Sequence, residues 1–172
     1  MDTYRHSPQW KISRFIFGDT RMSFIWLAPR LYVGYIWLMA GWEKWQNPVW
    51  VGEKAGVAVT GFLKGALEKT GGEHPAVMHW YGTFIEQVAL PHATLFSYLV
   101  TYGEIFVGLG LIVGLLTGLA GFFGVVMNFN YLLAGTTSIN PFLLLLQIPI
   151  VLAWRTAGHI GLDRFLFRKL HR

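Results

Sequence analysis

Apolar residues along the chain gather into stretches of membrane length, separated by shorter polar ones. A helix needs about 20 mostly apolar residues to cross the hydrocarbon core of a bilayer. Four stretches approach or reach that length, and they predict membrane spans over residues 24–45, 94–115, 118–135 and 141–161. Only Leu116 and Thr117 separate the second stretch from the third, so these two spans should form a tight helical hairpin. The pattern therefore predicts an all-α fold, an integral membrane four-helix bundle.

The longest polar stretch, residues 46–93, joins the first span to the second and has helical patterns of its own. Residues 60–71 predict a short helix with Thr60 as its N-cap and Gly71 at its end. Residues 74–91 predict an amphipathic helix bounded by two prolines. Its apolar face would hold Val77, Trp80, Tyr81, Phe84, Ile85 and Val88. We expect this face to lie on the outer leaflet or to cap the bundle.

The distribution of charge predicts the orientation. Lys and Arg gather before the first span and after the last, whereas residues 46–93 hold a near balance of Lys and Glu. Because cytoplasmic loops carry an excess of Lys and Arg, both termini should be cytoplasmic. That orientation agrees with four spans in a single membrane domain over residues 1–172. The Lys and Arg residues at the cytoplasmic ends then account for the net charge of +5, so we expect no nucleic-acid partner.

Composition narrows the possible chemistry. Only 13% of residues are charged, against about 25% in an average soluble domain. The chain has no cysteine, which excludes disulfides, thiolate catalysis and iron–sulfur or cysteine-based zinc sites within it. His74, His79 and His92 match no strong metal motif, so we expect no metal site. A histidine-ligated haem is a less favoured option.

One carboxylate, Glu104, stands in the middle of the second apolar stretch, LVTYGEIFVGLGLIVGLL. An ionisable residue at membrane depth is a candidate for function, because burying it in hydrocarbon is costly. The alternative is a protonated Glu104 that only holds helices together through a hydrogen bond. At about 1.5 Å per residue, Asn128 and Gln147 come to the same depth, near the midplane, while Arg30 and Arg155 form a layer nearer the cytoplasm. We expect Glu104 to face the bundle interior near Asn128.

The other polar and small residues allow two interpretations each. Arg30 and Arg155 could bind an anionic substrate or reach lipid headgroups. Asn128 and Gln147 fit hydrogen bonding between helices better than ligand binding. Two overlapping GxxxG patterns, at Gly110, Gly114 and Gly118, suit packing against the third span or against a second copy of the chain.

Four ordered stretches carry a resemblance to a known family: residues 30–45, 101–121, 128–141 and 157–166. They contain an Arg, Gly and GxxK pattern ending at Lys44, a GE pair at Glu104, and an Asn-rich turn into a helix that begins with proline. Together they resemble the DoxX family, and more closely its DoxD-type small subunit of thiosulfate:quinone oxidoreductase. The resemblance covers about residues 24–166 and rests on the ordered set.

The resemblance implies a multi-pass protein of the cytoplasmic (inner) membrane of a prokaryote, with quinone as cofactor and a second protein subunit on the outer face. In the DoxD case it implies oxidation of thiosulfate to tetrathionate, with the electrons passed to quinone. Glu104 would then exchange protons and Arg30 would stabilise charge, as the catalytic residues. The expected substrate- and quinone-binding residues are Lys44, Asn128, Tyr131, Gln147 and Arg155.

Two other functions remain open. The absence of a recognised haem, flavin or iron–sulfur motif favours a non-catalytic anchor or scaffold of a redox or stress-response complex, so the sequence does not decide whether the chain is an enzyme. Polar residues near the midplane also suit a small transporter. That function ranks third, because no inverted repeat is visible.

Overall fold

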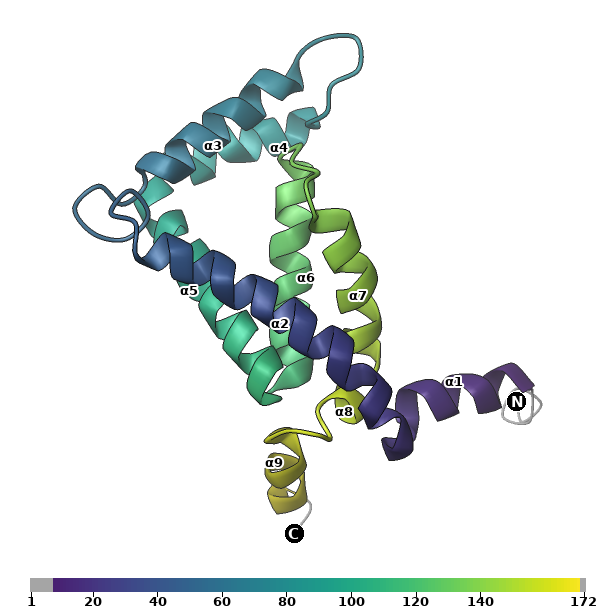
Figure 1. Ribbon diagram of the computed structural model, residues 1–172. Helices are drawn as coiled ribbons and strands as arrows, with labels where there is room; N and C mark the ends of the chain where they lie inside the picture. The colour runs from purple at the N-terminus through teal and green to yellow at the C-terminus, as the bar shows by residue number, and fades with distance from the viewer. Residues whose placement is uncertain (1–7, 171–172) are drawn as a thin grey trace.

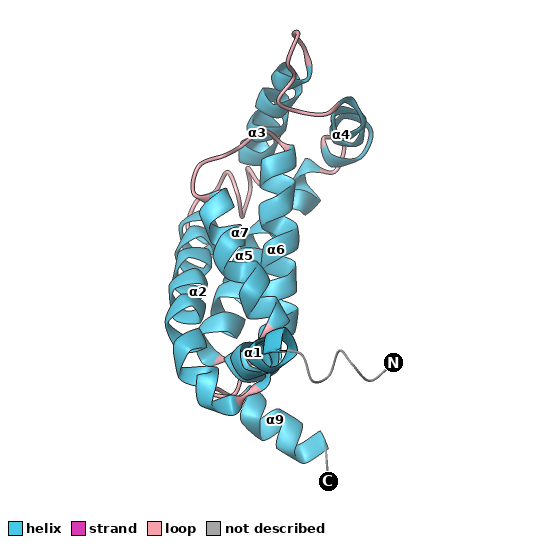
Figure 2. Ribbon diagram, turned by 90° about the vertical axis from the view of Figure 1, so that its right-hand side faces the viewer, coloured by secondary structure: helices cyan, strands magenta, loops and turns pink. Residues whose placement is uncertain are grey.

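The computed structural model describes residues 8–170, and this part of the chain is helical without strands. Helices α3 and α4 lie across one end of the molecule, and α1, α8 and α9 lie at the other (Figures 1 and 2). We call these the α3–α4 end and the terminal end. The helices are α1 (Pro8–Gly18), α2 (Ser23–Trp45), α3 (Val57–Leu67), α4 (His79–Phe84), α5 (Ala93–Val113), α6 (Thr117–Leu133), α7 (Asn140–Leu152), α8 (Trp154–Ala157) and α9 (Asp163–Leu170).

Between the two ends, α2, α5, α6 and α7 run along the molecule as its long helices (Figure 2). Two helical segments are long and apolar enough to cross a membrane, the 26 residues of Thr20–Trp45 and the 21 residues of Ala93–Val113. Both agree closely with the first two predicted spans. Helices α6 and α7 are apolar but shorter.

The predicted helix over residues 141–161 is wrong in its extent. Helix α7 ends at Leu152, the four-residue α8 follows, and the chain then leaves the helical conformation. Pro149 weakens the last turns of α7, because it cannot donate a hydrogen bond to the preceding turn. Thr156 then ties α8 to the N-terminal segment by donating its hydroxyl to the carbonyl of Phe17 at 2.8 Å.

Small residues bring α2 and α5 into backbone contact. A Cβ added at Gly108 would lie only 2.5 Å from the backbone nitrogen of Leu38, so no larger residue fits without separating the helices. The GxxxG stripe is used within the chain. An added Cβ at Gly110 would meet Ala120 at 2.9 Å, and one at Gly118 would meet Trp154 at 2.9 Å.

The segment between α2 and α5 folds over the bundle and packs against it. Helix α3 begins at Val57, after Gly56 with φ +97°, so the predicted N-cap Thr60 lies inside the helix. The helical segment ends before Gly71, as predicted. The second helix begins at His79, after residues 74–78, which are not helical, and it continues as a π-helical turn over Ile85–Ala89.

These loop helices share a hydrophobic core with the bundle. The core joins α3, α4, the start of α5 and the end of α6 through Val59, Leu63, Ala66, Val77, Tyr81, Ile85, Ala89, Ala93 and Ala134. The loop therefore caps the bundle, which is one of the two predicted arrangements. Trp80 and Val88 depart from the predicted buried face, because 58% and 43% of their surfaces are exposed.

Arg30 and Asp163 hold the terminal end together. The Arg30 guanidinium donates to the carbonyls of Ala157 at 2.6 Å and Ile160 at 2.7 Å, so it ties α2 to the segment after α8. The Asp163 carboxylate accepts from the backbone nitrogens of Leu116 at 2.6 Å and Thr117 at 2.9 Å. This carboxylate satisfies donors at the start of α6 that have no partner within the helix.

Candidate functional site

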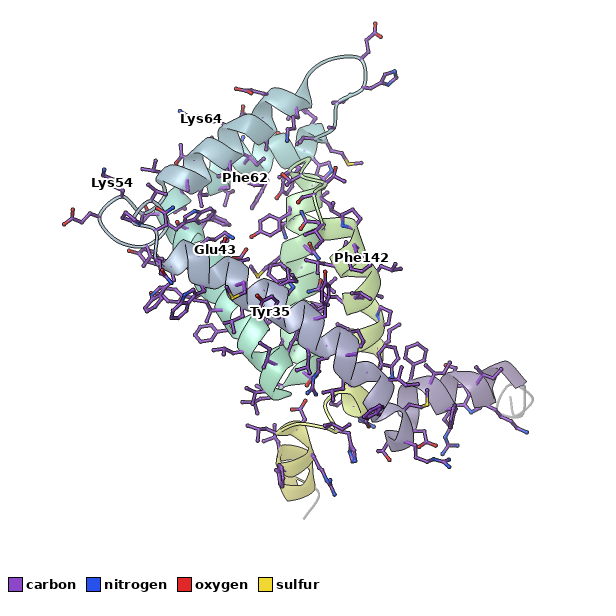
Figure 3. All side chains as sticks on the ribbon, viewed as in Figure 1. Tyr35, Glu43, Lys54, Phe62, Lys64 and Phe142 are labelled. Atoms are coloured by element: carbon purple, nitrogen blue, oxygen red, sulfur yellow. The ribbon has the colours of Figure 1, made fainter. Side chains whose placement is uncertain are left out.

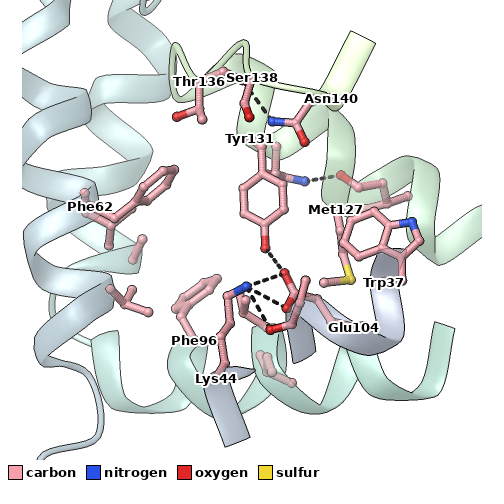
Figure 4. Close-up of a pocket in the computed structure, with 18 of the residues that line it drawn as sticks. Trp37, Lys44, Phe62, Phe96, Glu104, Met127, Tyr131, Thr136, Ser138 and Asn140 are labelled. Atoms are coloured by element: carbon pink, nitrogen blue, oxygen red, sulfur yellow. Dashed lines mark hydrogen bonds and ion pairs between the residues drawn. The ribbon is translucent and has the colours of Figure 1, made fainter. Parts of the chain in front are cut away.

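A cavity of about 580 Å³ lies between α2, α5, α6 and the start of α7, beneath the loop helices. Most of its walls are apolar or aromatic. Phe62 projects from α3 into the space between α2 and α6, which places a side chain of the loop opposite the bundle wall (Figures 3 and 4). A cavity of this size and lining is within the usual range of binding pockets for small molecules.

The ionisable groups Lys44, Glu104 and Tyr131 form a cluster in the cavity wall, hereafter the Glu104 cluster, while Asn130, Thr136, Ser138 and Asn140 are further polar residues of the lining (Figure 4). The Lys44 Nζ donates to both carboxylate oxygens of Glu104, at 2.7 and 3.0 Å. The Tyr131 hydroxyl donates to the Glu104 Oε1 at 2.7 Å. The Glu104 side chain is 2% exposed and that of Lys44 is 21% exposed, so the pair joins a buried carboxylate to a partly accessible ammonium group.

The positions of Lys44 and Glu104 follow from how α2 meets α5. Gly41 faces Glu104, and a Cβ at Gly41 would come within 3.0 Å of the Glu104 Cβ, so the missing side chain lets the helices close. Lys44 lies in the last turn of α2, and its Nζ stands over the Trp50 ring at 5.1 Å from the ring centre. Ser97 holds the Trp50 segment by donating its hydroxyl to the Trp50 carbonyl at 2.6 Å.

The Tyr131 ring is fixed between two other aromatic rings. It stacks on Trp37 at 6.4 Å between ring centres and meets Phe62 edge-on at 6.1 Å. Such packing restricts the ring, so its hydroxyl points steadily at Glu104. Above it, the Tyr81 hydroxyl donates to Asn130 at 3.2 Å. Burial raises the pKa of the Tyr81 hydroxyl, which keeps it protonated as a donor.

Three of the candidate residues come together, and the others do not. Lys44, Glu104 and Tyr131 share one cluster, while the expected neighbour of Glu104, Asn128, is not among its hydrogen-bond partners. Arg30 precedes Lys44 by fourteen positions on α2, which is about 21 Å along a helix. Its contacts at the terminal end favour a role in holding the fold.

The remaining candidates lie outside the cavity lining. Asn128 donates to Gln147 at 2.9 Å between α6 and α7, and both side chains are fully buried. This contact fits the hydrogen bonding between helices that the sequence favoured. Arg155 is exposed at the terminal end, where its guanidinium stands 4.9 Å from the centre of the Trp154 ring.

The spacing of the first span placed Trp37 on its inward face, but sequence reasoning missed Phe62 and Phe96, two aromatic side chains that also shape the cavity (Figure 4). Phe62 belongs to a helix whose docking over the bundle depends on contacts distant in sequence, so no local signal identified it. Within the described part of the chain, no group of three His, Asp or Glu side chains gathers as a possible metal site.

Comparison with known proteins gives a family assignment. Neither the comparison with curated proteins nor the one with solved structures returned a match. A sequence profile described as "TQO small subunit DoxD" matches residues 26–172, which is most of the chain and includes every residue of the Glu104 cluster. The profile describes a small subunit, which implies a larger assembly with a partner protein. By this match, the chain belongs to the DoxD family of membrane subunits.

Proposed function

We propose that the chain is the quinone-binding membrane subunit of a thiosulfate:quinone oxidoreductase, and that the cavity beside the Glu104 cluster receives the quinone head group. The observation that carries this proposal is an apolar cavity of about 580 Å³ with one buried ionisable cluster in its wall. A quinone is a neutral flat ring with two carbonyl oxygens. It suits apolar and aromatic walls with few hydrogen-bond donors, and the Lys44 ammonium would supply a donor here.

The cavity also suits a ligand that arrives from the lipid. Leu99, Val126 and Ile139 line it, and their exposed fractions are 57%, 38% and 40%. Side chains that border both a cavity and the molecular surface mark places where the cavity can open sideways between helices. An isoprenoid tail could leave through such an opening into the bilayer.

Thiosulfate is a poor fit for the same cavity. It carries two negative charges, and Lys44, the cationic side chain among the described lining residues, is already paired with Glu104. A dianion there would lose its hydration without receiving equivalent partners. We therefore assign the oxidation of two thiosulfate ions to tetrathionate, which releases two electrons, to a partner subunit on the outer face.

The residues of the cluster have distinct roles in this proposal. When bound, the quinone supplies the electron acceptor, which takes up two electrons and two protons. Glu104, which is ionised while paired with Lys44, would take up each of the two protons in turn and pass it towards the ring, and Tyr131 orients Glu104 through its hydroxyl hydrogen bond. Lys44 stabilises the ionised carboxylate after the proton has left.

In the membrane, both termini would face the cytoplasm.

Quinone binding can be measured on the purified chain. Trp37 and Trp50 line the cavity, so titration with a short-chain quinone should quench tryptophan fluorescence to saturation. We expect Glu104→Gln or Tyr131→Phe to weaken this binding about tenfold, because the first removes the carboxyl beside the head group and the second removes the hydrogen bond that orients it. Mass spectrometry of lipids extracted from mildly solubilised protein would identify the native quinone.

The matched control is Glu43→Gln, which removes an exposed carboxylate beside Lys44 on α2 and should bind quinone normally. Ala40→Trp places a large ring in the cavity wall and should abolish binding. If both Glu104→Gln and Ala40→Trp bind quinone as the unmodified chain does, the cavity is not the quinone site. A scaffold role for the chain would then be the better interpretation.

A further inference from the structure

We infer that Glu104 exchanges protons with the α3–α4 side of the membrane, through Lys44, and not with the side on which the termini lie. The inference deepens the proposed function, since it states which compartment supplies the protons for quinone reduction at this site. It depends on three features: the polar contacts of Glu104, the position of Lys44, and the packing between Glu104 and the terminal end.

Among the described residues, the polar contacts of Glu104 lie towards the α3–α4 end. Its carboxylate accepts hydrogen bonds from Lys44 and Tyr131, and Glu43 is the other titratable group that acts on it. Lys44 and Glu43 both lie in the last turn of α2, at the α3–α4 end, and Glu43 is exposed. The Lys44 side chain is 21% exposed while its Nζ contacts a carboxylate whose side chain is 2% exposed, so Lys44 is the more accessible member of the pair and lies at the α3–α4 end of it.

Towards the terminal end, closely packed apolar side chains separate Glu104 from the layer of Arg30. These side chains are Val33, Trp37, Val107, Leu111, Leu143 and Ile150, each no more than 3% exposed, and Trp37 and Leu143 form the floor where the layer meets the cavity. Beside them, α2 and α5 touch through their backbones, because a Cβ at Gly34 would lie 3.1 Å from the Gly108 carbonyl oxygen. Across this layer, no hydrogen bond among the described residues links Glu104 to Arg30, since Glu104 bonds to Lys44 and Tyr131 and Arg30 to the carbonyls of Ala157 and Ile160.

The polar pair within this layer does not extend the contacts of Glu104. Asn128 and Gln147 bond to one another, and neither is a hydrogen-bond partner of Glu104 or Tyr131 in the described structure. Gln147 Nε2, Asn128 Oδ1 and Trp37 Nε1 have no hydrogen-bond partner, and a Cβ added at Gly124 would lie 2.5 Å from Gln147 Nε2 and 3.4 Å from Trp37 Nε1. If protons did cross towards the terminal end, these groups would be the first candidates to carry them.

The side of the membrane that supplies the protons decides whether quinone reduction at this site moves net charge across the membrane. If the electrons also arrive from the α3–α4 side, then electrons and protons reach the quinone from the same compartment. Their transfer would then move no net charge across the membrane. A site fed with protons from the terminal side would instead move charge as the quinone is reduced.

A pH-clamp experiment on the full-length chain tests the inference. The protein is reconstituted into phosphatidylcholine–phosphatidylglycerol vesicles, and its orientation is read from protease cleavage of a C-terminal tag. The interior and exterior are buffered separately, one acidic and one alkaline, in all four combinations. Dicyclohexylcarbodiimide then reaches carboxyls through the bilayer and adds to those that carry a proton. Mass spectrometry quantifies the label on Glu104.

We expect labelling of Glu104 to rise severalfold when the α3–α4 side is acidic and to be unaffected by the pH on the terminal side. Glu104→Gln should lose the label, and Glu43→Gln should keep it. Labelling that follows the terminal side, or both sides equally, would overturn the inference. Absence of label in every combination would also overturn it, since a carboxyl open to an acidic solution carries a proton. No quinone is present, so this result is separate from the quinone titration.

Discussion

The sharpest test of the Glu104 cluster is to remove the charge of Lys44 with Lys44→Met, a substitution of similar length. The Glu104 carboxylate would lose two hydrogen bonds, at 2.7 and 3.0 Å, and keep the one from Tyr131. Removing one partner of a buried ion pair costs about 3 to 5 kcal/mol of folding stability, since the other charge stays buried without compensation. Because 21% of the Lys44 side chain is exposed, we expect the lower limit, about 3 kcal/mol.

The double variant Lys44→Met with Glu104→Gln should be more stable than Lys44→Met alone. It buries no charge, and the Gln carbonyl can still accept from Tyr131, so we expect a total loss of about 1 kcal/mol. The second substitution would then restore about 2 kcal/mol. The assay is reversible unfolding in mixed micelles by increasing dodecyl sulfate, followed by tryptophan fluorescence.

A matched control is Lys64→Met on the exposed surface of α3, which should change the free energy of unfolding by less than about 0.5 kcal/mol. If the double variant is no more stable than Lys44→Met, the cost of the single substitution does not come from an unpaired carboxylate. The account of the cluster as a coupled ion pair would then be refuted.

Three further predictions concern the fold, and thermal unfolding of purified variants checks each of them. Arg30→Lys keeps the charge but loses the forked contact with two carbonyls, so it should lower the free energy of unfolding by about 2 kcal/mol without changing quinone affinity. Weakened quinone binding by this variant would contradict a purely structural role for Arg30. Gly108→Ala forces a methyl group against the backbone of Leu38 and should lower the free energy of unfolding by about 1 to 3 kcal/mol. At Gly61 the added methyl group meets open space, so Gly61→Ala should raise the free energy of unfolding by up to about 1 kcal/mol. Equal effects of the two substitutions would contradict the packing argument. Asp163→Asn weakens a charged cap of α6 and should cost about 1 kcal/mol, and an unchanged melting temperature would count against that role.

The first two spans could be predicted to within a few residues because their ends are encoded locally. Helix α5 ends where Gly114 takes φ +68°, a conformation that other residues rarely adopt. The break after α7 could not be predicted in this way. The apolar pattern continues past Leu152, and the bend depends on the contact between Thr156 and Phe17, which lie 139 positions apart.

Only part of the candidate site could be predicted, because its other part also depends on contacts between residues distant in sequence. Glu104 is visible as a lone carboxylate in an apolar run, but its partner depends on how far α5 is displaced along α2. The segment after α2 lies alongside the start of α5, where the Ser97 hydroxyl donates to the carbonyl of Trp50. This displacement brings Glu104 level with Lys44 in the last turn of α2. Depth counted separately along each helix placed Glu104 beside Asn128 instead.

Among the buried charged side chains of the described residues, Arg30 and Glu104 differ in what borders them, and that difference separates a structural role from a functional one. The Arg30 guanidinium is enclosed by protein, since a Cβ at Gly114 would lie 2.6 Å from its Nη1 and both Nη1 and Nη2 donate to backbone carbonyls. Glu104 borders a cavity large enough for a ring-sized ligand. Both groups are costly to bury. Only a charge with free space beside it can act on a second molecule, so Glu104 is where chemistry should be sought.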